Sequence, residues 1–541
     1  MFPKLTDEQI SRLMSFGHRR HVAKEEVIFQ PGDTKRNFYV VLSGQIEIDT
    51  PFEEGAIHIT LHQNGEFTGE VDILSGRQSL VRGRALVESE LLEIDQDNLR
   101  QIIQTDPELS DLFLRAFVLR RTELIAQKSG GVILIGSNHS ADTLRLKAFL
   151  SRNAQPYTYI DVESDINVQE LLDHFQIGLD EIPVIVCRDR PVLRNPTNKE
   201  IADCLGFNTE INVSRIYDLV VIGAGPAGLA AAVYGASEGL DVLVLEGNAP
   251  GGQAGSSSRI ENYLGFPMGI SGQELAGRAF VQAEKFGAHI SIAQQATKLD
   301  CDAHPMTVKC TGDISIQGQA IIIATGAEYR KLGISNLSQF EGVGVYYGAT
   351  YVEAQLCKGD EVIVVGGGNS AGQAAIFLST VAKHVYLLVR GSGLSDTMSR
   401  YLIRRIEECS DITFLPFTEI EELEGNGRLE RVTWRNNRTD EQESHNIHHI
   451  FSMTGASPNT GWLQGCVALD EQGFIKTGPE LKAKDLKSAN WPLRRRPYLF
   501  ETNLNRVFAV GDVRSGSVKR VASAVGEGSV AIQLIHKVLA E

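Results

Sequence analysis

The sequence predicts a multidomain fold: an N-terminal β jelly roll, a smaller α/β unit, and an α/β region with two dinucleotide-binding, Rossmann-like domains. Three observations predict this organisation. Short β-type runs broken by glycine occupy the chain up to about residue 99. Alternating strand and helix patterns follow from residue 130, and two glycine-rich turns of the dinucleotide-binding type lie beyond residue 215. A chain of 541 residues is also too long for a single hydrophobic core.

The charge and the cysteines limit the classes of function. A formal net charge of −16 argues against nucleic acid or an anionic membrane as the main partner, because phosphates would be repelled. No apolar run approaches the roughly 20 residues that span a bilayer, and the N-terminus lacks the apolar core of a signal peptide. The seven cysteines are widely spread without a Cys-x-x-Cys, a pattern that offers neither a metal site nor a disulfide framework and suits a reducing compartment. We therefore expect a cytoplasmic protein. The cysteines are Cys187, Cys204, Cys301, Cys310, Cys357, Cys409 and Cys466.

The first expected domain covers residues 1–127. Runs such as "NFYVVLSGQIEID" and "IHITLHQNGEF" alternate in the manner of antiparallel strands, and "DNLRQIIQTDPELSDLFLRAFVLRRTELIAQ" has helical spacing. The order of these pieces resembles the cyclic-nucleotide-binding domain of the catabolite-activator family. No helix-turn-helix follows the barrel, which argues against a repressor.

The resemblance implies a ligand site in this barrel. Gly69 and Glu70 match the family's ribose-binding pair, whereas the family's phosphate-binding arginine falls on Ser79, with Arg77 and Arg82 nearby. Without a fixed arginine a cyclic phosphate loses its main charge-assisted contact. Two interpretations stay open: a cyclic nucleotide held by Gly69, Glu70, Arg77 and Arg82, or a docking or regulatory barrel that takes another ligand or none.

The middle unit, residues 130–207, reads as strand, helix, strand, helix, hairpin and helix. This order resembles a glutaredoxin or thioredoxin-like fold, with Pro183 at the position of the family's cis-proline. The family's Cys-x-x-Cys falls on Ser140-Ala141-Asp142-Thr143, which cannot form a thiolate. We expect docking or presentation of a peptide-binding groove rather than redox chemistry.

The first glycine turn lies in "YDLVVIGAGPAGLAAAVYGASEGLDVLVLEG" and belongs to an expected domain of residues 215–334 and 457–541. Gly223 allows the tight turn, Gly225 lets the backbone approach a pyrophosphate, and Gly228 permits close packing of helix on strand. Glu246 stands where a carboxylate accepts hydrogen bonds from a ribose.

The second turn lies in "DEVIVVGGGNSAGQAAIFLSTVAKHVYLLVRG", within an expected domain of residues 335–456. Gly366, Gly368 and Ala371 fill the three fingerprint positions. The following strand ends in Arg390 rather than an acid, which favours NADPH over NADH because an arginine pairs with a 2′-phosphate. The next helix has three arginines, of which either one assists in this pairing or all form a solvated face: Arg400, Arg404 and Arg405.

From about residue 215 to the C-terminus the chain resembles the low-molecular-weight thioredoxin reductases. Six motifs stand in that family's order: "GGQ" at 251–253, "IENYLGFP" with Asn262, "IIIATGA" at 321–327, "TGASPNT" at 454–460, "VFAVGDV" at 507–513, and "KRVASAVGEG" at 519–528. The resemblance implies bound FAD, diffusible NADPH and a homodimer. The FAD residues it implies are Gly223, Gly225, Pro226, Ala227, Gly228, Glu246, Gly252, Gln253, Asn262, Thr325, Gly326, Gly511, Asp512, Arg520, Val521 and Ala522. The NADPH residues it implies are Gly366, Gly368, Asn369, Ser370, Ala371 and Arg390.

One element of that family is missing. The position of its redox Cys-x-x-Cys reads Gly348-Ala349-Thr350-Tyr351, which removes the step between flavin and thioredoxin. The fused arrangement resembles the flavoprotein subunit of alkyl hydroperoxide reductase, whose relay also depends on paired cysteines. Cys357 has no partner at that spacing and is expected to be a buried structural thiol.

Three functional hypotheses follow. The first is an NADPH-dependent FAD oxidoreductase whose flavin reduces an acceptor other than an internal disulfide, such as a quinone, oxygen or a metal complex. Tyr351 and Glu353 would then flank the flavin, and either could donate a proton. The second is a thioredoxin-disulfide reductase that uses an unforeseen thiol, such as Cys357 with a partner's cysteine. The third is a non-catalytic sensor of flavin redox state or nucleotides.

Overall fold

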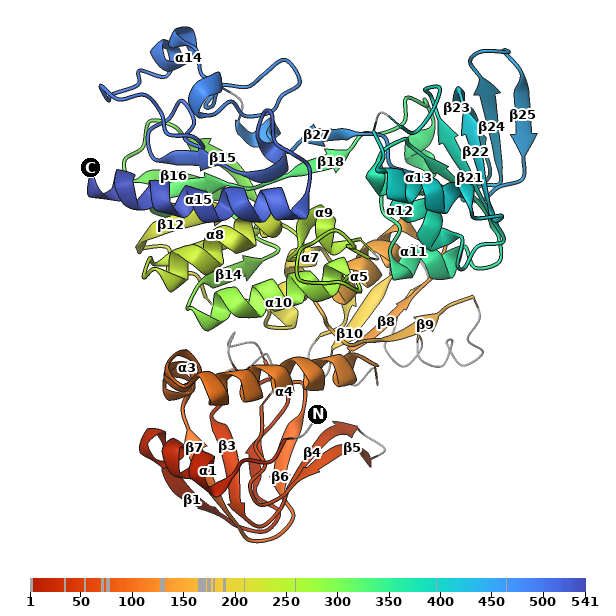
Figure 1. Cartoon of the computed structure of the whole chain (residues 1–541). Coiled ribbons are helices and arrows are strands. Elements are labelled where there is room, and N and C mark those ends of the chain that lie inside the picture. The colour runs from red at the N-terminus through yellow and green to blue at the C-terminus, as the bar shows by residue number, and fades with distance from the viewer. Residues whose placement is uncertain are drawn as a thin grey trace.

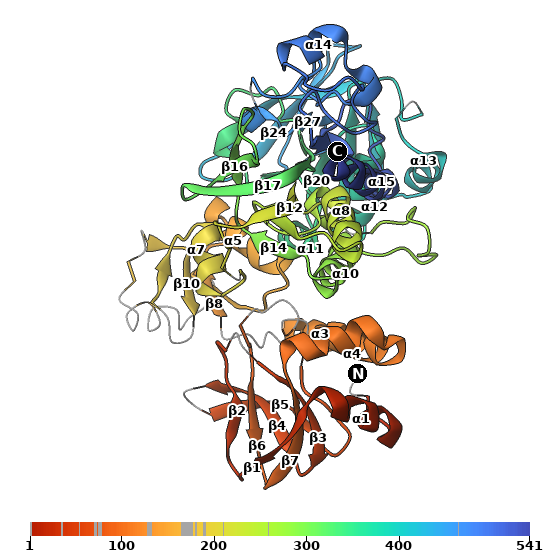
Figure 2. The ribbon, with the colours of Figure 1, turned by 90° about the vertical axis from the view of Figure 1, so that its left-hand side faces the viewer.

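The structure is a computed structural model of the chain. It describes residues 3–33, 36–52, 55–69, 73, 78–126, 132–163, 172, 177–178, 181–187, 191–208, 210–257, 259–395, 397–463 and 465–541. Figure 1 shows a β-barrel at one end and the two nucleotide domains at the other, and Figure 2 shows the same separation from the side. The long α4 lies between the barrel and the rest of the molecule in both views. The described residues contain no helix long and apolar enough to cross a membrane.

The barrel is built from two antiparallel sheets of strand order β1-β7-β3 and β2-β6-β4-β5. Four phenylalanines fill its core, and two of them come from the closing helix α4, which explains why that helix packs onto the barrel: Phe38, Phe67, Phe113 and Phe117. The strands are β1 (His18–Val22), β2 (Val27–Phe29), β3 (Phe38–Ser43), β4 (Ile46–Phe52), β5 (Gly55–His62), β6 (Arg82–Ala85) and β7 (Ser89–Ile94). The helices are α1 (Asp7–Leu13), α3 (Gln96–Thr105) and α4 (Pro107–Ala126).

The middle domain has a four-stranded sheet of order β11-β10-β8-β9. Strands β8 and β9 are parallel and joined by α5, whereas β10 runs antiparallel to both β8 and β11. The Ile182–Pro183 peptide bond before β10 is cis. The elements are β8 (Val132–Gly136), α5 (Ala141–Arg152), β9 (Thr158–Asp161), β10 (Val184–Cys187), β11 (Leu193–Arg194) and α7 (Asn198–Cys204).

The first nucleotide domain contains a seven-stranded sheet of order β14-β13-β12-β17-β16-β15, with β28 also paired to β17. Its central strands are buried Val, Ile and Leu runs, as expected for parallel strands covered on both faces. Helices α8 and α10 follow their strands, and α15 packs along α8. The elements are β12 (Ile216–Ile222), α8 (Pro226–Ser237), β13 (Val242–Glu246), α9 (Gly252–Gly255), α10 (Gly272–Lys285), β14 (His289–Ile292), β15 (Ala296–Asp300), β16 (Met306–Cys310), β17 (Ile314–Ile323), η4 (Gly461–Leu463), η5 (Gly478–Glu480), α14 (Ala483–Ser488), β28 (Val507–Ala509), η6 (Gly511–Val513) and α15 (Val521–Ala540).

The second nucleotide domain contains a five-stranded parallel sheet of order β19-β26-β20-β21-β22 and a three-stranded antiparallel sheet, β23-β24-β25. The antiparallel pair of β18 (Ala327–Tyr329) and β27 (Ala456–Pro458) joins the two nucleotide domains, so the chain crosses between them at the motifs "IIIATGA" and "TGASPNT". The other elements are η3 (Leu337–Gln339), β19 (Val345–Tyr346), α11 (Tyr351–Leu356), β20 (Glu361–Val365), α12 (Asn369–Leu378), β21 (His384–Val389), α13 (Arg400–Glu407), β22 (Ile412–Pro416), β23 (Thr418–Glu424), β24 (Arg431–Asn436), β25 (Gln442–His445) and β26 (His449–Ser452).

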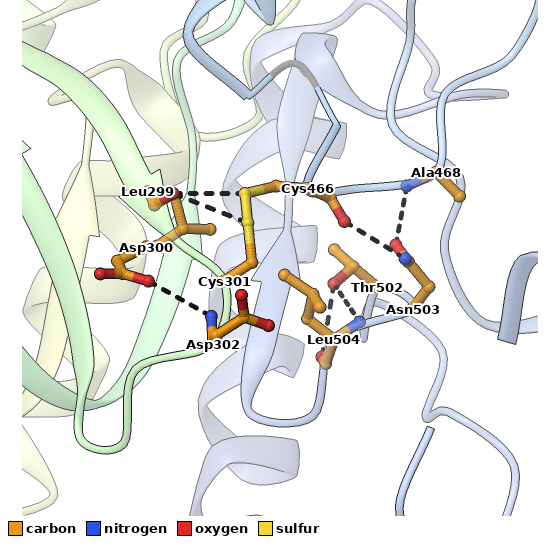
Figure 3. The surroundings of a disulfide bond; sticks show 9 residues. All are labelled: Leu299, Asp300, Cys301, Asp302, Cys466, Ala468, Thr502, Asn503 and Leu504. Carbon is orange, nitrogen blue, oxygen red and sulfur yellow. Dashed lines mark hydrogen bonds between the residues drawn. A yellow bond between two sulfur atoms is a disulfide. The ribbon is translucent and has the colours of Figure 1, made fainter. Parts of the chain in front are cut away.

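A disulfide joins Cys301 and Cys466 in the first nucleotide domain, with their Cα atoms 5.7 Å apart (Figure 3). This corrects the expectation that the cysteines offer no disulfide. The two residues are 165 positions apart, and they meet because η4 packs against β15. Asn503 holds the segment after Cys466, since its Oδ1 accepts from the Ala468 N–H at 2.7 Å.

Candidate functional site between the two nucleotide domains

The first glycine turn has the shape that a dinucleotide site requires. Gly223, directly after β12, has a φ of 101°, and a Cβ there would lie 2.5 Å from the carbonyl oxygen of Ala324. A Cβ on Gly228 would clash with the carbonyl oxygen of Gly223. Both positions therefore accept only glycine, and the turn brings the start of α8 close to the end of β12.

The N-terminus of α8 is open to an anionic ligand. Gly225 is its N-cap and Pro226 its first residue, and among the described residues no side chain caps it. The atom nearest to a Cβ on Gly225 is the Cα of Gly252, at 3.9 Å. Unpaired N–H groups at this end, together with the helix dipole, favour a phosphate. Ala227 follows in the first turn.

Glu246 ends β13 beside this turn. Its Oε2 accepts from the Ala224 N–H at 2.7 Å and its Oε1 from the Asn248 N–H at 2.8 Å. Burial raises the pKa of Glu246, and those backbone donors, with Ala249, oppose the shift. The carboxylate is thus held in one orientation at the end of the strand, as a ribose-binding acid needs to be.

The C-terminal motifs converge on the same turn. Gly511 lies against α8, since a Cβ there would stand 2.9 Å from the Cβ of Ala227. Burial raises the pKa of the neighbouring Asp512. Arg520, the N-cap of α15, is followed by Val521 and Ala522 at the start of that helix. These groups surround one open helix end with a fixed acid and glycine-lined space, so the residues present fit FAD.

The two crossover segments are tied together near this turn. The Thr325 hydroxyl donates to the carbonyl of Asn459 at 2.9 Å, and the Asn459 amide donates to the carbonyl of Thr325 at 3.0 Å. Gly326 follows with a φ of 65°. This reciprocal pair fixes the chain where it leaves and re-enters the first nucleotide domain.

The second glycine turn repeats the arrangement in the other domain. Gly366 has a φ of 143°, and a Cβ there would lie 2.5 Å from the carbonyl oxygen of Met453. Gly368 is the N-cap of α12, with no other atom within 4 Å of its Cβ position among the described residues. The Asn369 Oδ1 accepts from the Ser399 N–H at 2.7 Å. This helix end also fits a dinucleotide phosphate.

The arginines near the second turn have different surroundings. Arg390 follows β21 with a side chain that is 84% exposed, and its Nε lies 3.7 Å from Glu419. Arg405 reaches Glu261 of the other nucleotide domain at 3.2 Å. Arg404 pairs with Glu408 on its own helix, at 2.9 Å. Arg390 is therefore accessible to a ligand at the end of this strand.

A cavity, called the central cavity, lies between the two nucleotide domains. Both nucleotide domains line it, through Gln253, Ser256, Ser257, Arg259, Gly348, Ala349, Ser370, Gln373, Ala374 and Met453. Sequence reasoning had singled out Gln253 and Ser370 as cofactor residues and Gly348 as a lost cysteine. It missed Ser256 and Gln373, whose spacing in the chain carries no signal. Gly348 thus borders a space that both nucleotide domains line.

Tyr351 and Glu353, the predicted proton donors, have different surroundings. Glu353 accepts from the Thr350 N–H at 3.0 Å and from the Thr350 hydroxyl, so it caps the start of α11. The Tyr351 side chain is 73% exposed and does not belong to the described lining of the cavity. Asn262 lies in the loop beside Glu261, the partner of Arg405.

Cys357 is fully buried behind α11. Burial raises the pKa of its thiol to about 12. Since only a thiolate attacks a disulfide, this cysteine is inert at neutral pH. The position agrees with the expectation of a structural thiol.

The predicted barrel ligands are only partly described. Arg82 is held by the buried Asp49, with Nη2 at 2.7 Å from Oδ2. The Gly69 carbonyl accepts from Arg120 Nη1 at 2.8 Å. Glu70 and Arg77 lie outside the described residues.

Sequence reasoning missed Arg36 in the same barrel. Its Nη1 donates to the Ser79 hydroxyl at 3.3 Å, and both side chains are buried. Its Nε and Nη2 are buried without a hydrogen-bond partner among the described residues. A buried arginine with two open donors thus stands beside the position where the family resemblance placed a phosphate ligand.

A family model described as pyridine nucleotide-disulphide oxidoreductase matches residues 217–528. The chain belongs to this family. The chain is similar to the thioredoxin reductase of Bacillus subtilis, with 32% identity over 328 residues, or 60% of this chain and 96% of that protein. The thioredoxin reductase of Mycolicibacterium smegmatis is 32% identical over 327 residues, or 60% of this chain and 97% of its own length. This pyridine nucleotide-disulphide oxidoreductase is thus FAD-dependent and homologous to thioredoxin reductases.

Solved structures agree with this family assignment. Lactococcus lactis thioredoxin reductase, in the conformation called FR, aligns with a TM-score of 0.54 and 29% identity, over 60% of this chain and 99% of that one. T. acidophilum thioredoxin reductase aligns with a TM-score of 0.53 and 28% identity, over 60% of this chain and 100% of that one. A second family model, cyclic nucleotide-binding domain, matches residues 19–106 of the oxidoreductase described here. The chain therefore joins such a domain to the flavoprotein.

Proposed function

We propose that this protein is an NADPH-dependent FAD oxidoreductase whose flavin reduces an acceptor other than an internal disulfide. One observation carries the proposal: Gly348 lines the cavity between the two nucleotide domains at a position where the resemblance to thioredoxin reductases implies a cysteine, and the sequence contains no Cys-x-x-Cys. The burial of Cys357 supports it, because burial raises the pKa of this thiol to about 12 and so disfavours its thiolate at neutral pH.

The chain's own residues would bind and orient the two nucleotides. FAD, when bound at the first glycine turn, supplies the two-electron chemistry. The open end of α8 at Gly225 holds its phosphates, and Glu246 accepts from a ribose. The open end of α12 at Gly368 holds the phosphates of the nicotinamide nucleotide, and Arg390 selects NADPH through the 2′-phosphate. We propose the same cofactor-binding roles for the other FAD and NADPH residues that the sequence predicts.

We retain Tyr351 and Glu353 as proposed proton donors. The exposed phenol of Tyr351 is accessible to an acceptor that approaches along α11. Glu353 also caps the start of that helix, so its replacement would destabilise the helix as well. Tyr351→Phe, which keeps the ring and removes the proton, separates the two roles: proton donation predicts a lower kcat with an unchanged KM for NADPH.

Acceptor specificity tests the proposed function. Purified protein is supplied with NADPH and, in separate reactions, with a quinone, ferricyanide, oxygen, or thioredoxin with a chromogenic disulfide. The proposal predicts sustained NADPH oxidation with a non-thiol acceptor and none with the disulfides. Turnover with thioredoxin that is lost in Cys357→Ser would favour the disulfide-reductase alternative. Nucleotide binding without turnover on any acceptor would favour the sensor.

A second proposal concerns the barrel, which we infer binds a nucleotide through Arg36. Its two open donors are buried beside Ser79, and an unpaired buried guanidinium is costly unless an anion joins it. Calorimetric titration with cyclic AMP and cyclic GMP tests this. We expect binding by the wild type, loss in Arg36→Ala, and no change in Arg19→Ala, a control at an exposed ion pair with Glu90. Equal binding by both variants would contradict the assignment.

The homodimer implied by the family resemblance remains a prediction. Light scattering on the purified protein tests it directly, since one chain has a mass of 59.3 kDa.

A further inference from the structure

Helix α5 of the middle domain contacts both nucleotide domains. At its start, the Cβ of Ala141 lies 3.0 Å from the Cβ position of Gly342 in the second nucleotide domain. Leu144 belongs to the same buried cluster as Ala349, which lines the central cavity. At its end, Arg152 reaches the first nucleotide domain. One helix thus contacts both nucleotide domains.

The end of α5 is bound closely to the FAD side. Arg152 Nη2 donates to the carbonyl of Gly252 at 2.9 Å. Asn153 Nδ2 donates to the carbonyl of Asn248 at 3.3 Å, and Asn198 Nδ2 donates to the Asn248 Oδ1 at 3.2 Å. The acceptors of these hydrogen bonds lie in the segment that runs from Glu246 through the "GGQ" motif. We expect this segment to surround the adenosine and the pyrophosphate of FAD.

Arg152 contacts the segment that packs against the first glycine turn. A Cβ on Gly252, the acceptor of Arg152, would lie 3.1 Å from the Cα of Gly225 at the open end of α8. The Nε of Arg152 is buried and has no hydrogen-bond partner among the described residues. Burial lowers the pKa of Arg152, while Glu246 and Glu353 oppose that shift, and the guanidinium remains charged at neutral pH. A cation with an unused donor therefore contacts Gly252, which in turn lies against the open end of α8.

We propose that the middle domain completes the FAD site, with Arg152 as the positioning residue that holds Gly252 and sets a positive charge beside the pyrophosphate. This assigns a role to the middle domain, which contains no Cys-x-x-Cys. The inference rests on FAD dependence and is independent of the acceptor, so failure of the acceptor proposal leaves it intact. An arginine suits this role because a pyrophosphate is a dianion that would accept from the unpartnered Nε.

Affinity of the apoprotein for FAD tests the proposal. FAD is titrated into the apoprotein of the full chain, and the dissociation constant is measured from the change in flavin fluorescence. Arg152→Gln keeps a donor of similar shape without the charge, whereas Arg152→Lys keeps the charge. Asn198→Ala is the matched control, since it removes a contact of the same interface without changing any charge. Circular dichroism verifies that each apoprotein is folded.

We expect Arg152→Gln to raise the dissociation constant about tenfold, Arg152→Lys by less than about threefold, and Asn198→Ala by less than about twofold. Added KCl should weaken FAD binding more in the wild type than in Arg152→Gln. An Arg152→Gln variant within about twofold of the wild type would overturn the proposal. Equal weakening in all three variants would also overturn it, because domain docking without the charge would then explain the effect.

Discussion

Gly348 faces Ser256 across the central cavity: a Cβ on Gly348 would stand 3.9 Å from both the Cβ and the hydroxyl oxygen of Ser256. The space for a cysteine side chain is therefore present although the cysteine is not. Gly348 also does not need a positive φ, so a larger residue is sterically acceptable there. The cavity therefore has room for a side chain at position 348.

This space predicts the behaviour of a variant in which the thiol pair is restored. Gly348→Cys with Tyr351→Cys places two cysteines at x-x spacing, at the start of α11, where the helix end favours a thiolate. The double variant should take up about one more equivalent of NADPH than the wild type before the flavin bleaches. Gly348→Cys alone, which cannot form the pair, is the control and should behave as the wild type.

Cys357 should be dispensable for turnover. Its pKa of about 12 leaves almost no thiolate at neutral pH, so Cys357→Ser should leave kcat and KM for NADPH within about twofold of the wild type. The buried hydroxyl should lower the free energy of unfolding by about 1 kcal/mol. Steady-state assays and thermal melts measure the two effects. A loss of activity larger than that in Cys409→Ser, the control at a partly buried thiol, would contradict the structural role.

Arg390 should decide the preference for NADPH. Its exposed guanidinium is available to a 2′-phosphate, so Arg390→Ala should raise KM for NADPH about tenfold and leave KM for NADH nearly unchanged. Arg404→Ala is the control, because that residue pairs with Glu408 on its own helix. If both variants shift KM for NADPH equally, the net charge of the domain and not Arg390 sets the preference.

The Cys301–Cys466 disulfide predicts a thiol count. Denatured protein should expose five thiols without reductant, from Cys187, Cys204, Cys310, Cys357 and Cys409, and all seven of the chain's cysteines after reduction. The link closes a loop of 165 positions, so Cys301→Ser with Cys466→Ser should cost about 2–5 kcal/mol of stability. Seven thiols in the unreduced, denatured protein would show that the bond does not form in solution.

The sequence predicted the features whose chemistry is local. Gly223 and Gly366 stand in turns that their immediate neighbours define, so the fingerprints indicated both nucleotide folds and the turns within them. Strand-and-glycine alternation likewise indicated the N-terminal barrel, which the family match supports.

The sequence could not predict the contacts between distant segments. Cys301 meets Cys466 only because η4 packs on β15, and no spacing of cysteines announces that pairing. Arg152 lies 100 positions before Gly252, in a different domain, so nothing near it in the chain marks a role at the FAD site. Glu353 was predicted as a proton donor from its place in the motif, and its engagement by Thr350 depends on where α11 begins.

The most direct test of the account is an anaerobic titration of the purified flavoprotein with NADPH that follows the oxidised-flavin absorbance. NADH is titrated separately, and the double variant Cys301→Ser with Cys466→Ser is titrated in parallel. The account predicts complete bleaching by about one equivalent of NADPH in both proteins, and much weaker bleaching by NADH. A second equivalent consumed by the wild type would contradict the account, since an internal disulfide would then accept electrons. Its disappearance in the double variant would identify Cys301–Cys466 as that acceptor.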